Sequence, residues 1–415
     1  MTVDRSPLTV RRYGRGQRST VDGQREAQWP LILAVLLTAV NLRTAVASVP
    51  PLIDELRDSV PLSGAAAGVL TTLPVVCMAL GATMVPPLAR RMGHELPLVL
   101  VGITMASGML VRVAPGAVAL YAGTTIAGMG VAFGNVLVPS LVKRDFHERA
   151  GFMTGIYTMA ISTSAGLAAG LTVPIENAIG HGWRAALAVW AAPALVAGLV
   201  WVPFARHPAA VADRRSTTPH VSSGLLRDRL AWHVTLFMGV QSLMFYSLLS
   251  WLPSILQDNG MSKGTSGAYL SIFTLLGIPV CFAVPVIAAR MRDQRALVAA
   301  SVLFLAGGIA GLIASPGSAA IVWALLAGVS QAATLALAFL FFVLRSRNQA
   351  QAAELSSMAQ SFGYALAAVG PVIMGALHEA TNGWTAPLWF LLVLLIPELV
   401  FGLEAGRRRQ VGADR

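Results

Sequence analysis

Cysteine and charge are both scarce in this chain. Its 415 residues include two cysteines, Cys77 and Cys281, and both fall inside long apolar runs, which argues against a disulfide framework. Charged residues make up 12% of the sequence and apolar residues 55%, and the mean hydropathy is +0.67. No soluble domain of this length has such a composition, so the chain is expected to be a membrane protein.

Signatures of catalysis, metal binding and nucleotide binding are missing as well. His181, His233 and His378 show no metal-ligand spacing inside a plausible site. The sequence has no Walker loop, which argues against ATP-driven transport by this chain alone. No Ser/His/Asp arrangement at membrane depth points to an intramembrane hydrolase. We therefore expect no catalytic residues, no metal and no cofactor.

Long apolar runs are what the sequence has in abundance. About 20 apolar residues in a helix cover the roughly 30 Å hydrocarbon layer of a bilayer. The runs are continuous, whereas strands of a membrane barrel alternate polar and apolar residues over about ten positions. The sequence therefore predicts an all-α membrane protein with twelve transmembrane helices, at about 29–50, 64–86, 94–113, 117–141, 151–173, 183–204, 231–256, 266–289, 296–314, 319–344, 355–377 and 385–404.

Basic residues are distributed unevenly between the two sides of these spans. Of 30 Lys and Arg residues, 25 fall on one side, and the positive-inside rule then makes both termini cytoplasmic. This predicts a multi-pass protein of the cell (plasma or inner) membrane. The basic face would contact anionic lipid rather than nucleic acid. The first 28 residues are polar and lack the apolar core of a signal peptide, so we expect a disordered cytoplasmic tail.

An internal repeat divides the spans into six plus six. Ala127-Gly128 returns as Ala327-Gly328, and Pro51 returns as Pro253, at a nearly constant offset. The longest loop between spans separates the two copies. The sequence therefore predicts a basic tail at 1–28, six-helix bundles at 29–204 and 231–404, a cytoplasmic linker at 205–230, and a second basic tail at 405–415.

Several segments carry a family resemblance. They are Asn41-Leu42-Arg43-Thr44, Val49-Pro50-Pro51-Leu52-Ile53-Asp54-Glu55, Leu70-Thr71-Thr72-Leu73-Pro74-Val75, Pro87-Leu88-Ala89-Arg90-Arg91-Met92-Gly93 and Gly182-Trp183-Arg184-Ala185-Ala186-Leu187. Through them the chain resembles the major facilitator superfamily along its whole length. Within that superfamily it looks most similar to the cyanate and nitroimidazole transporter (CynX/NimT) family.

The resemblance implies alternating access between two bundles, with the solute near the midplane. It implies a small anionic or planar polar solute, such as cyanate or a nitroimidazole, and a cytoplasmic gating loop at Arg90, Arg91 and Gly93. Ala89 and Arg90 stand where that loop usually has an acidic residue, so this chain departs from the family pattern of a charge relay there. Span 4 also lacks the buried arginine, and span 5 the Gly-Pro step, of proton-coupled drug exporters.

Arg43 is the residue that we expect to matter most, because it lies deep in the first span. A guanidinium at that depth costs about 2.5–3.5 kcal/mol on insertion scales and needs a partner, a wet cavity or an anionic ligand. A structural ion pair and a substrate contact are both open. The central parts of spans 1, 4, 5, 7, 8, 10 and 11 contain no Asp or Glu. An unpaired arginine there favours planar or linear anions. Glu398, in span 12, is expected to pair or snorkel rather than to carry protons.

Other polar and aromatic residues at membrane depth complete the predicted site. Asn41 and Arg43 point about 200° apart on a helix, and the pattern leaves open which of them faces the cavity. Tyr246 falls near the place in span 7 that Arg43 occupies in span 1. Such side chains suit a planar solute, although hydrogen bonding between helices is an equal alternative for each. The predicted contacts are Arg43, Asn41, Tyr246, Gln241, Asn135, Tyr157, Trp251, Gln331, Gln360 and Tyr364.

The sequence thus predicts a secondary active transporter that moves a small anion or planar polar solute and works as a monomer. One rival is a multidrug efflux transporter. The second rival is a membrane-embedded enzyme or sensor without transport, against which the repeat and the short loops argue.

Overall fold

Helices make up the regular structure of the chain. The computed structural model describes residues 16–92, 95–146, 150–206, 223–317 and 319–412, and every regular element within these ranges is helical. In chain order they are α1 (Gly16–Ala47), the 3-10 turn η1 (Pro50–Leu52), α2 (Ile53–Ser59), α3 (Gly64–Met92), α4 (Glu95–Val111), α5 (Ala117–Asp145), α6 (Ala150–Ile179), α7 (Gly182–Val189), α8 (Ala191–Val200), α9 (Val202–Arg206), α10 (Ser223–Leu226), α11 (Arg229–Asp258), α12 (Lys263–Leu275), α13 (Gly277–Ala289), α14 (Arg295–Ala314), α15 (Ala320–Leu344), α16 (Gln349–Ala367), α17 (Val369–Thr381) and α18 (Thr385–Ala405).

Ten helical segments in the described ranges are long and apolar enough to cross a membrane. Their ends lie close to the predicted spans: α14 and α15, for example, begin within one residue of the expected positions. The first tail differs from expectation. α1 already begins at Gly16, so 16–28 is helical rather than disordered, while 1–15 lie outside the described residues. Extending an existing helix is cheap, because each added residue gains a hydrogen bond without a new nucleation step.

Prolines divide three of the predicted spans into shorter helices. A proline has no N–H to donate to the carbonyl four residues earlier, and its ring crowds that carbonyl. The ends of α7, α12 and α16 each lie four residues before a proline. The pairs are Val189 and Pro193, Leu275 and Pro279, and Ala367 and Pro371.

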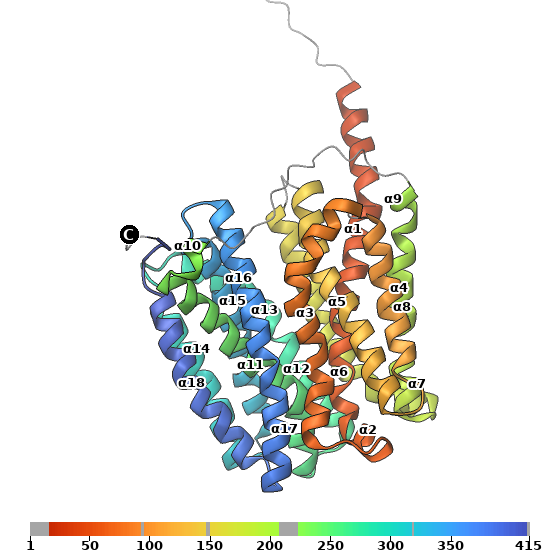
Figure 1. Cartoon of the computed structure of the whole chain (residues 1–415), viewed down its shortest axis with the longest axis vertical. Coiled ribbons are helices and arrows are strands. Elements are labelled where there is room, and N and C mark those ends of the chain that lie inside the picture. Colours follow the sequence, from red (N-terminus) through yellow and green to blue (C-terminus); the bar gives the residue numbers. More distant parts are fainter. Residues whose placement is uncertain (1–15, 93–94, 147–149, 207–222, 318, 413–415) are drawn as a thin grey trace, which may run out of the picture.

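The helices form two groups that lie side by side (Figure 1). The first group contains α1 to α9 and the second contains α10 to α18. The described part of the C-terminus and the start of α1 lie toward the same end of the molecule. We call the opposite end, which holds α2, α7 and the turn between α17 and α18, the far end.

Small residues let helices within the first group approach until their backbones touch. A Cβ placed on Gly102 in α4 would lie 2.4 Å from the Cα of Gly198 in α8. One placed on Gly108 would lie 2.3 Å from the backbone nitrogen of Ala127 in α5. Glycines at these positions therefore fix the distance between helices, as is usual in membrane bundles.

Candidate functional site

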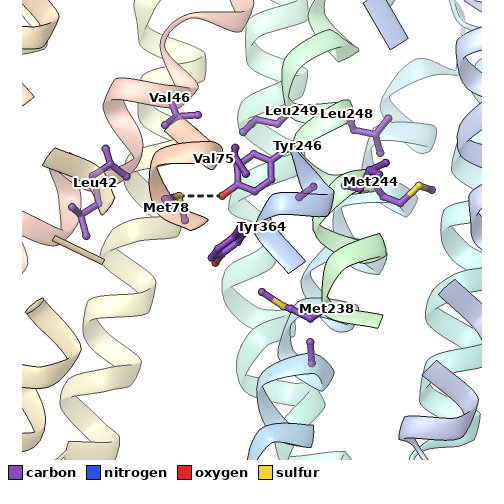
Figure 2. Packing of buried hydrophobic residues seen from close by; sticks show 14 of the residues in the cluster. Leu42, Val46, Val75, Met78, Met238, Met244, Tyr246, Leu248, Leu249 and Tyr364 are labelled. Atoms are coloured by element: carbon purple, nitrogen blue, oxygen red, sulfur yellow. Dashed lines mark hydrogen bonds between the residues drawn. The ribbon is translucent and has the colours of Figure 1, made fainter. Parts of the chain in front are cut away.

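Arg43 lies where the two groups of helices meet. Its Nη1 atom donates a hydrogen bond of 2.6 Å to the hydroxyl of Tyr246 on α11. The guanidinium carbon is 5.6 Å from the centre of the Tyr246 ring. The Tyr246 hydroxyl points toward Met78 of α3, whose sulfur lies 3.7 Å away (Figure 2). A chain of contacts therefore runs from α1 through α11 to α3.

Two more tyrosines complete the surroundings of Arg43. The ring of Tyr364, on α16, stands edge-on to that of Tyr246, with the centroids 6.4 Å apart, and Figure 2 shows the two side by side. Tyr157, on α6, is also close enough to interact electrostatically with Arg43. Four of the ten predicted contacts thus gather in one place: Arg43, Tyr157, Tyr246 and Tyr364.

The contact between Arg43 and Tyr246 joins two residues whose spacing matches the predicted internal repeat. The two residues are 203 positions apart, which is close to the repeat offset. The pair therefore joins two positions that correspond in the predicted repeat, one from each group.

The charge of Arg43 is not neutralised by a carboxylate among the described residues. The ion pairs formed within the described ranges involve other residues, and the hydrogen-bond acceptor of Arg43 is a neutral hydroxyl. The side chain is half-buried rather than fully enclosed. A guanidinium has five donors, and most of them remain available for an acceptor with two oxygens.

Helix geometry separates Asn41 from this cluster. The amide nitrogen of Asn41 donates to the carbonyl of Leu37 in its own helix, at 2.7 Å, and to that of Pro193 in α8, at 3.1 Å. Asn41 is thus part of the packing inside the first group, whereas Arg43 points toward the second group. The two side chains thus have different neighbours: the amide of Asn41 contacts α8 and the guanidinium of Arg43 contacts α11.

Three further predicted contacts have their polar atoms engaged in protein packing. Gln241 donates to Ser242 Oγ at 2.7 Å, and it is 1% exposed. Trp251 donates to the carbonyl of Pro371 at 2.8 Å. Gln360 donates to Ser356 Oγ, one turn away in its own helix. The structure gives these side chains roles between and within helices.

Asn135 and Gln331 keep polar atoms without a partner among the described residues. They are Nδ2 of Asn135 in α5, and both Nε2 and Oε1 of Gln331 in α15. Gln331 is 2% exposed. Buried amide groups are rarely left unpaired, so these two are available for a polar ligand or water.

The predicted gating loop lies largely beyond what the structure describes. Arg90 and Arg91 fall in the last turn of α3, but their side chains are not described. Gly93 lies outside the described residues. Their expected role in gating therefore stays a prediction.

A second set of contacts joins the groups at the far end. Lys263, at the start of α12, forms ion pairs with Glu55 of α2 and with Glu176 of α6, the latter at 2.6 Å. The carboxylate of Glu379, in α17, accepts a hydrogen bond of 2.8 Å from the backbone N–H of Gly64 at the start of α3. A negative charge is favourable at that helix end.

The backbones also come close at the far end. A Cβ on Gly64 would lie 2.4 Å from the carbonyl oxygen of Gly375, and one on Gly68 would lie 2.5 Å from that of Pro371. These contacts join α3 to α17. The equivalent pair in the repeat, α6 and α12, approaches closely at Gly267, where a Cβ would lie 2.9 Å from the carbonyl oxygen of Ala169.

Met78 and Lys263 make contacts between the two groups of helices that the sequence did not predict. Met78 has no signal beyond being apolar in an apolar span. Lys263 could have been found, because it is one of few basic residues on the side opposite the termini. Within the described residues no group of three or more His, Cys, Asp or Glu side chains is placed to hold a metal ion.

These features define a class of protein: a multi-pass membrane transporter built from two groups of helices. The family model of the Major Facilitator Superfamily matches residues 31–368. An uncharacterized transporter of Bacillus subtilis (strain 168), YycB, is 39% identical over 92% of this chain and 94% of its own. The 2-nitroimidazole transporter of Escherichia coli (strain K12) is 37% identical over 92% of this chain and 96% of its own.

A more distant relative is the cyanate transport protein CynX of Escherichia coli (strain K12), 27% identical over 90% of this chain and 96% of its own. Among solved structures, a bacterial homologue of the human lysosomal transporter Spinster, in an inward-facing and occupied conformation, superposes with a TM-score of 0.74 at 15% identity. That match covers 94% of this chain and 97% of the homologue. The chain belongs to the Major Facilitator Superfamily, and its similarity to the CynX/NimT transporters confirms the predicted resemblance.

Proposed function

We propose that this protein is a secondary active transporter of a small anion or planar polar solute, with Arg43 as the main substrate contact. The observation that carries the proposal is the state of Arg43. It lies between the two groups of helices, is held by a neutral hydroxyl, and has no carboxylate partner among the described residues. Its charge is therefore available to a ligand.

The side chains gathered around Arg43 narrow the class of solute further. A planar guanidinium binds two oxygens at once, and tyrosine rings offer flat faces and hydroxyl donors. The relatives are named for cyanate, a linear anion, and for 2-nitroimidazole, which carries a planar nitro group with two oxygens. Both solutes present electron-rich ends to a cation. A cationic drug would be repelled by Arg43, which disfavours the multidrug alternative.

We further propose twelve membrane spans with both termini in the cytoplasm. Ten segments qualify by length and composition, and α4 and α6 would complete the set, since α6 is 30 residues long. Twelve spans place both ends of the chain on one side, and that side carries most of the basic residues. The six-helix bundles at 29–204 and 231–404, the linker at 205–230, the lipid contacts and the monomeric state are parts of the same proposal.

The contacts between the two groups of helices at the far end fit a mechanism of alternating access. The ion pairs of Lys263 and the close approach of α3 to α17 lie at the far end, which would face away from the cytoplasm. Contacts there would close the site to the outside, as expected of an inward-facing state. The similar Spinster homologue is inward-facing in its solved structure. Transport would then require these contacts to break while others form at the opposite end.

The test is entry of labelled solute into proteoliposomes. Wild-type protein, Arg43→Gln and Arg43→Lys would be compared with labelled cyanate and with 2-nitroimidazole. Arg290→Gln is the matched control, because Arg290 is exposed at the end of α13. We expect saturable entry with wild type and control, loss with Arg43→Gln, and partial retention with Arg43→Lys. Equal entry with wild type and Arg43→Gln would make Arg43 structural and overturn the proposal.

A further inference from the structure

Glu398 is a carboxyl group buried inside the second group of helices. It lies on the face of α18 that also carries the buried residues Leu391, Leu395 and Gly402. One turn along this face, a Cβ on Gly402 would lie 2.8 Å from the ring of Phe237 in α11 and 2.6 Å from Val298 in α14. Glu398 therefore belongs to the packed seam where α18 meets α11 and α14 (Figure 1).

Its surroundings leave the carboxyl without a polar partner. Glu398 is 0% exposed, and neither of its oxygens has a hydrogen-bond partner in the described part of the chain. The sequence predicted that this side chain would pair or snorkel, and the structure shows that it does neither. Glu404, in the same helix, shows the contrast, because it forms a 3.0 Å ion pair with Arg407 and is partly exposed.

Within the described residues, no neighbouring element places a basic group within ion-pair distance of the Glu398 carboxyl. On α11 the titratable group facing α18 is His233, whose ring is 6.1 Å from that of Phe401. On α14 it is Arg295, at the end of the helix beside Gly406. On α17 it is His378, which stacks on Trp384 at the far end. Arg295 and His378 lie toward the two ends of α18, whereas Phe401, which His233 approaches, is about one helical turn from Glu398.

An ionised carboxylate in such a place is very unfavourable. Moving an unpaired charge out of water costs far more than burying the neutral acid, so a group of this kind takes up a proton instead. Ionisable residues are rare in membrane helices, and those that persist there commonly serve ion or proton pathways. The neutral acid still lacks a hydrogen bond, so Glu398 is retained at a cost in stability.

We propose that Glu398 is a proton-binding site that couples transport to protons. The coupling of this proton to transport rests on the proposed function. The carboxyl takes a proton from water on one side of the membrane and returns it to water on the other. It changes only between its acid and carboxylate forms. The link to the solute site is α11, which contacts α18 through Phe237 and carries Tyr246 nine residues further on.

Infrared spectroscopy tests the proton directly. A protonated carboxylic acid has a C=O stretching band that is absent from carboxylates and shifts in D2O. Purified wild type and Glu398→Gln would be compared at neutral pH, with Glu404→Gln as the matched control. We expect Glu398→Gln to lose a protonated-acid band and Glu404→Gln to keep it. Identical bands in wild type and Glu398→Gln would overturn the proposal. If the Gln variant does not fold, Glu398→Met replaces it, because an apolar side chain suits this seam.

Transport measurements test the coupling. Counterflow of labelled cyanate or 2-nitroimidazole needs no net proton movement, whereas accumulation driven by a pH gradient does. We expect Glu398→Gln to retain counterflow and to lose gradient-driven accumulation, while Glu404→Gln retains both. Accumulation by Glu398→Gln equal to wild type would overturn the coupling. Absence of counterflow in the wild type would instead count against the proposed function, and the infrared comparison would still decide whether Glu398 holds a proton.

Discussion

Replacing Lys263 by methionine is expected to open the far end of the protein. Lys263 of α12 reaches across to Glu55 and Glu176 of the first group, and these ion pairs help to hold the groups together at that end. Methionine keeps most of the length of the side chain and removes its charge. The two carboxylates, which both contact the Lys263 ammonium, would then repel each other.

The size of the effect follows from the exposure of the three side chains. Lys263 is 29% exposed, Glu55 36% and Glu176 9%, so solvent screens the pair with Glu55 more than the pair with Glu176. Exposed pairs contribute about 0.2–1 kcal/mol each. With the added repulsion, the loss is about 1–2 kcal/mol. This changes the ratio of closed to open far ends about 5–30-fold.

Distance measurements by electron paramagnetic resonance would detect this change. Spin labels at His181 and Asn259, both exposed at the far end and in different groups, report the separation there. We expect Lys263→Met to increase the fraction of long distances and Lys263→Arg, which keeps the charge, to leave it near the wild-type level. An unchanged distance distribution in Lys263→Met, or an equal shift in Lys263→Arg, would refute the reasoning.

Three further changes test other contacts. Gly68→Ala should lower the melting temperature or open the far end, because the added Cβ would lie 2.5 Å from a backbone oxygen. Gly264→Ala is the control, because no atom lies within 4 Å of a Cβ at that position, and it should leave the melting temperature unchanged. Tyr246→Phe should weaken solute binding measured by calorimetry, because the guanidinium of Arg43 loses the hydrogen bond that holds it in place for the solute. Arg112→Met should lower the melting temperature, because fully buried Arg112 donates to the Ala45 carbonyl near the end of α1, and an unsatisfied acceptor costs about 1–3 kcal/mol. Unchanged values would count against the role assigned to each contact.

Hydropathy was enough to predict the helices, and the repeat offset was enough to single out Tyr246 as the counterpart of Arg43. Long apolar runs need no tertiary information to be read as spans, because the bilayer fixes their length. The repeat offset gave Tyr246 the place in span 7 that Arg43 occupies in span 1, and the structure brings the two residues into contact. Proline positions account for the helix breaks, although the sequence alone did not show which prolines would interrupt a helix.

The roles of individual polar residues could not be predicted in the same way. Asn41 and Gln241 are as polar as any ligand contact, and only the packing shows that their amides bond within and between helices. Lys263 contributes through partners 208 and 87 positions away, which no local pattern reveals. Glu398 lacks a hydrogen-bond partner because of the side chains that three separate helices place around it, and the sequence does not show that arrangement.

Equilibrium binding tests the central claim, that Arg43 provides the charge that recognises the solute, most directly. Calorimetry would give Kd values for cyanate and 2-nitroimidazole with purified wild type and Arg43→Gln. Each charge-assisted hydrogen bond is worth about 1.5–3 kcal/mol, so loss of one weakens binding about tenfold or more. The account predicts at least this loss for the solute that the wild type binds. Equal Kd values for the two proteins, with the variant folded, would contradict it.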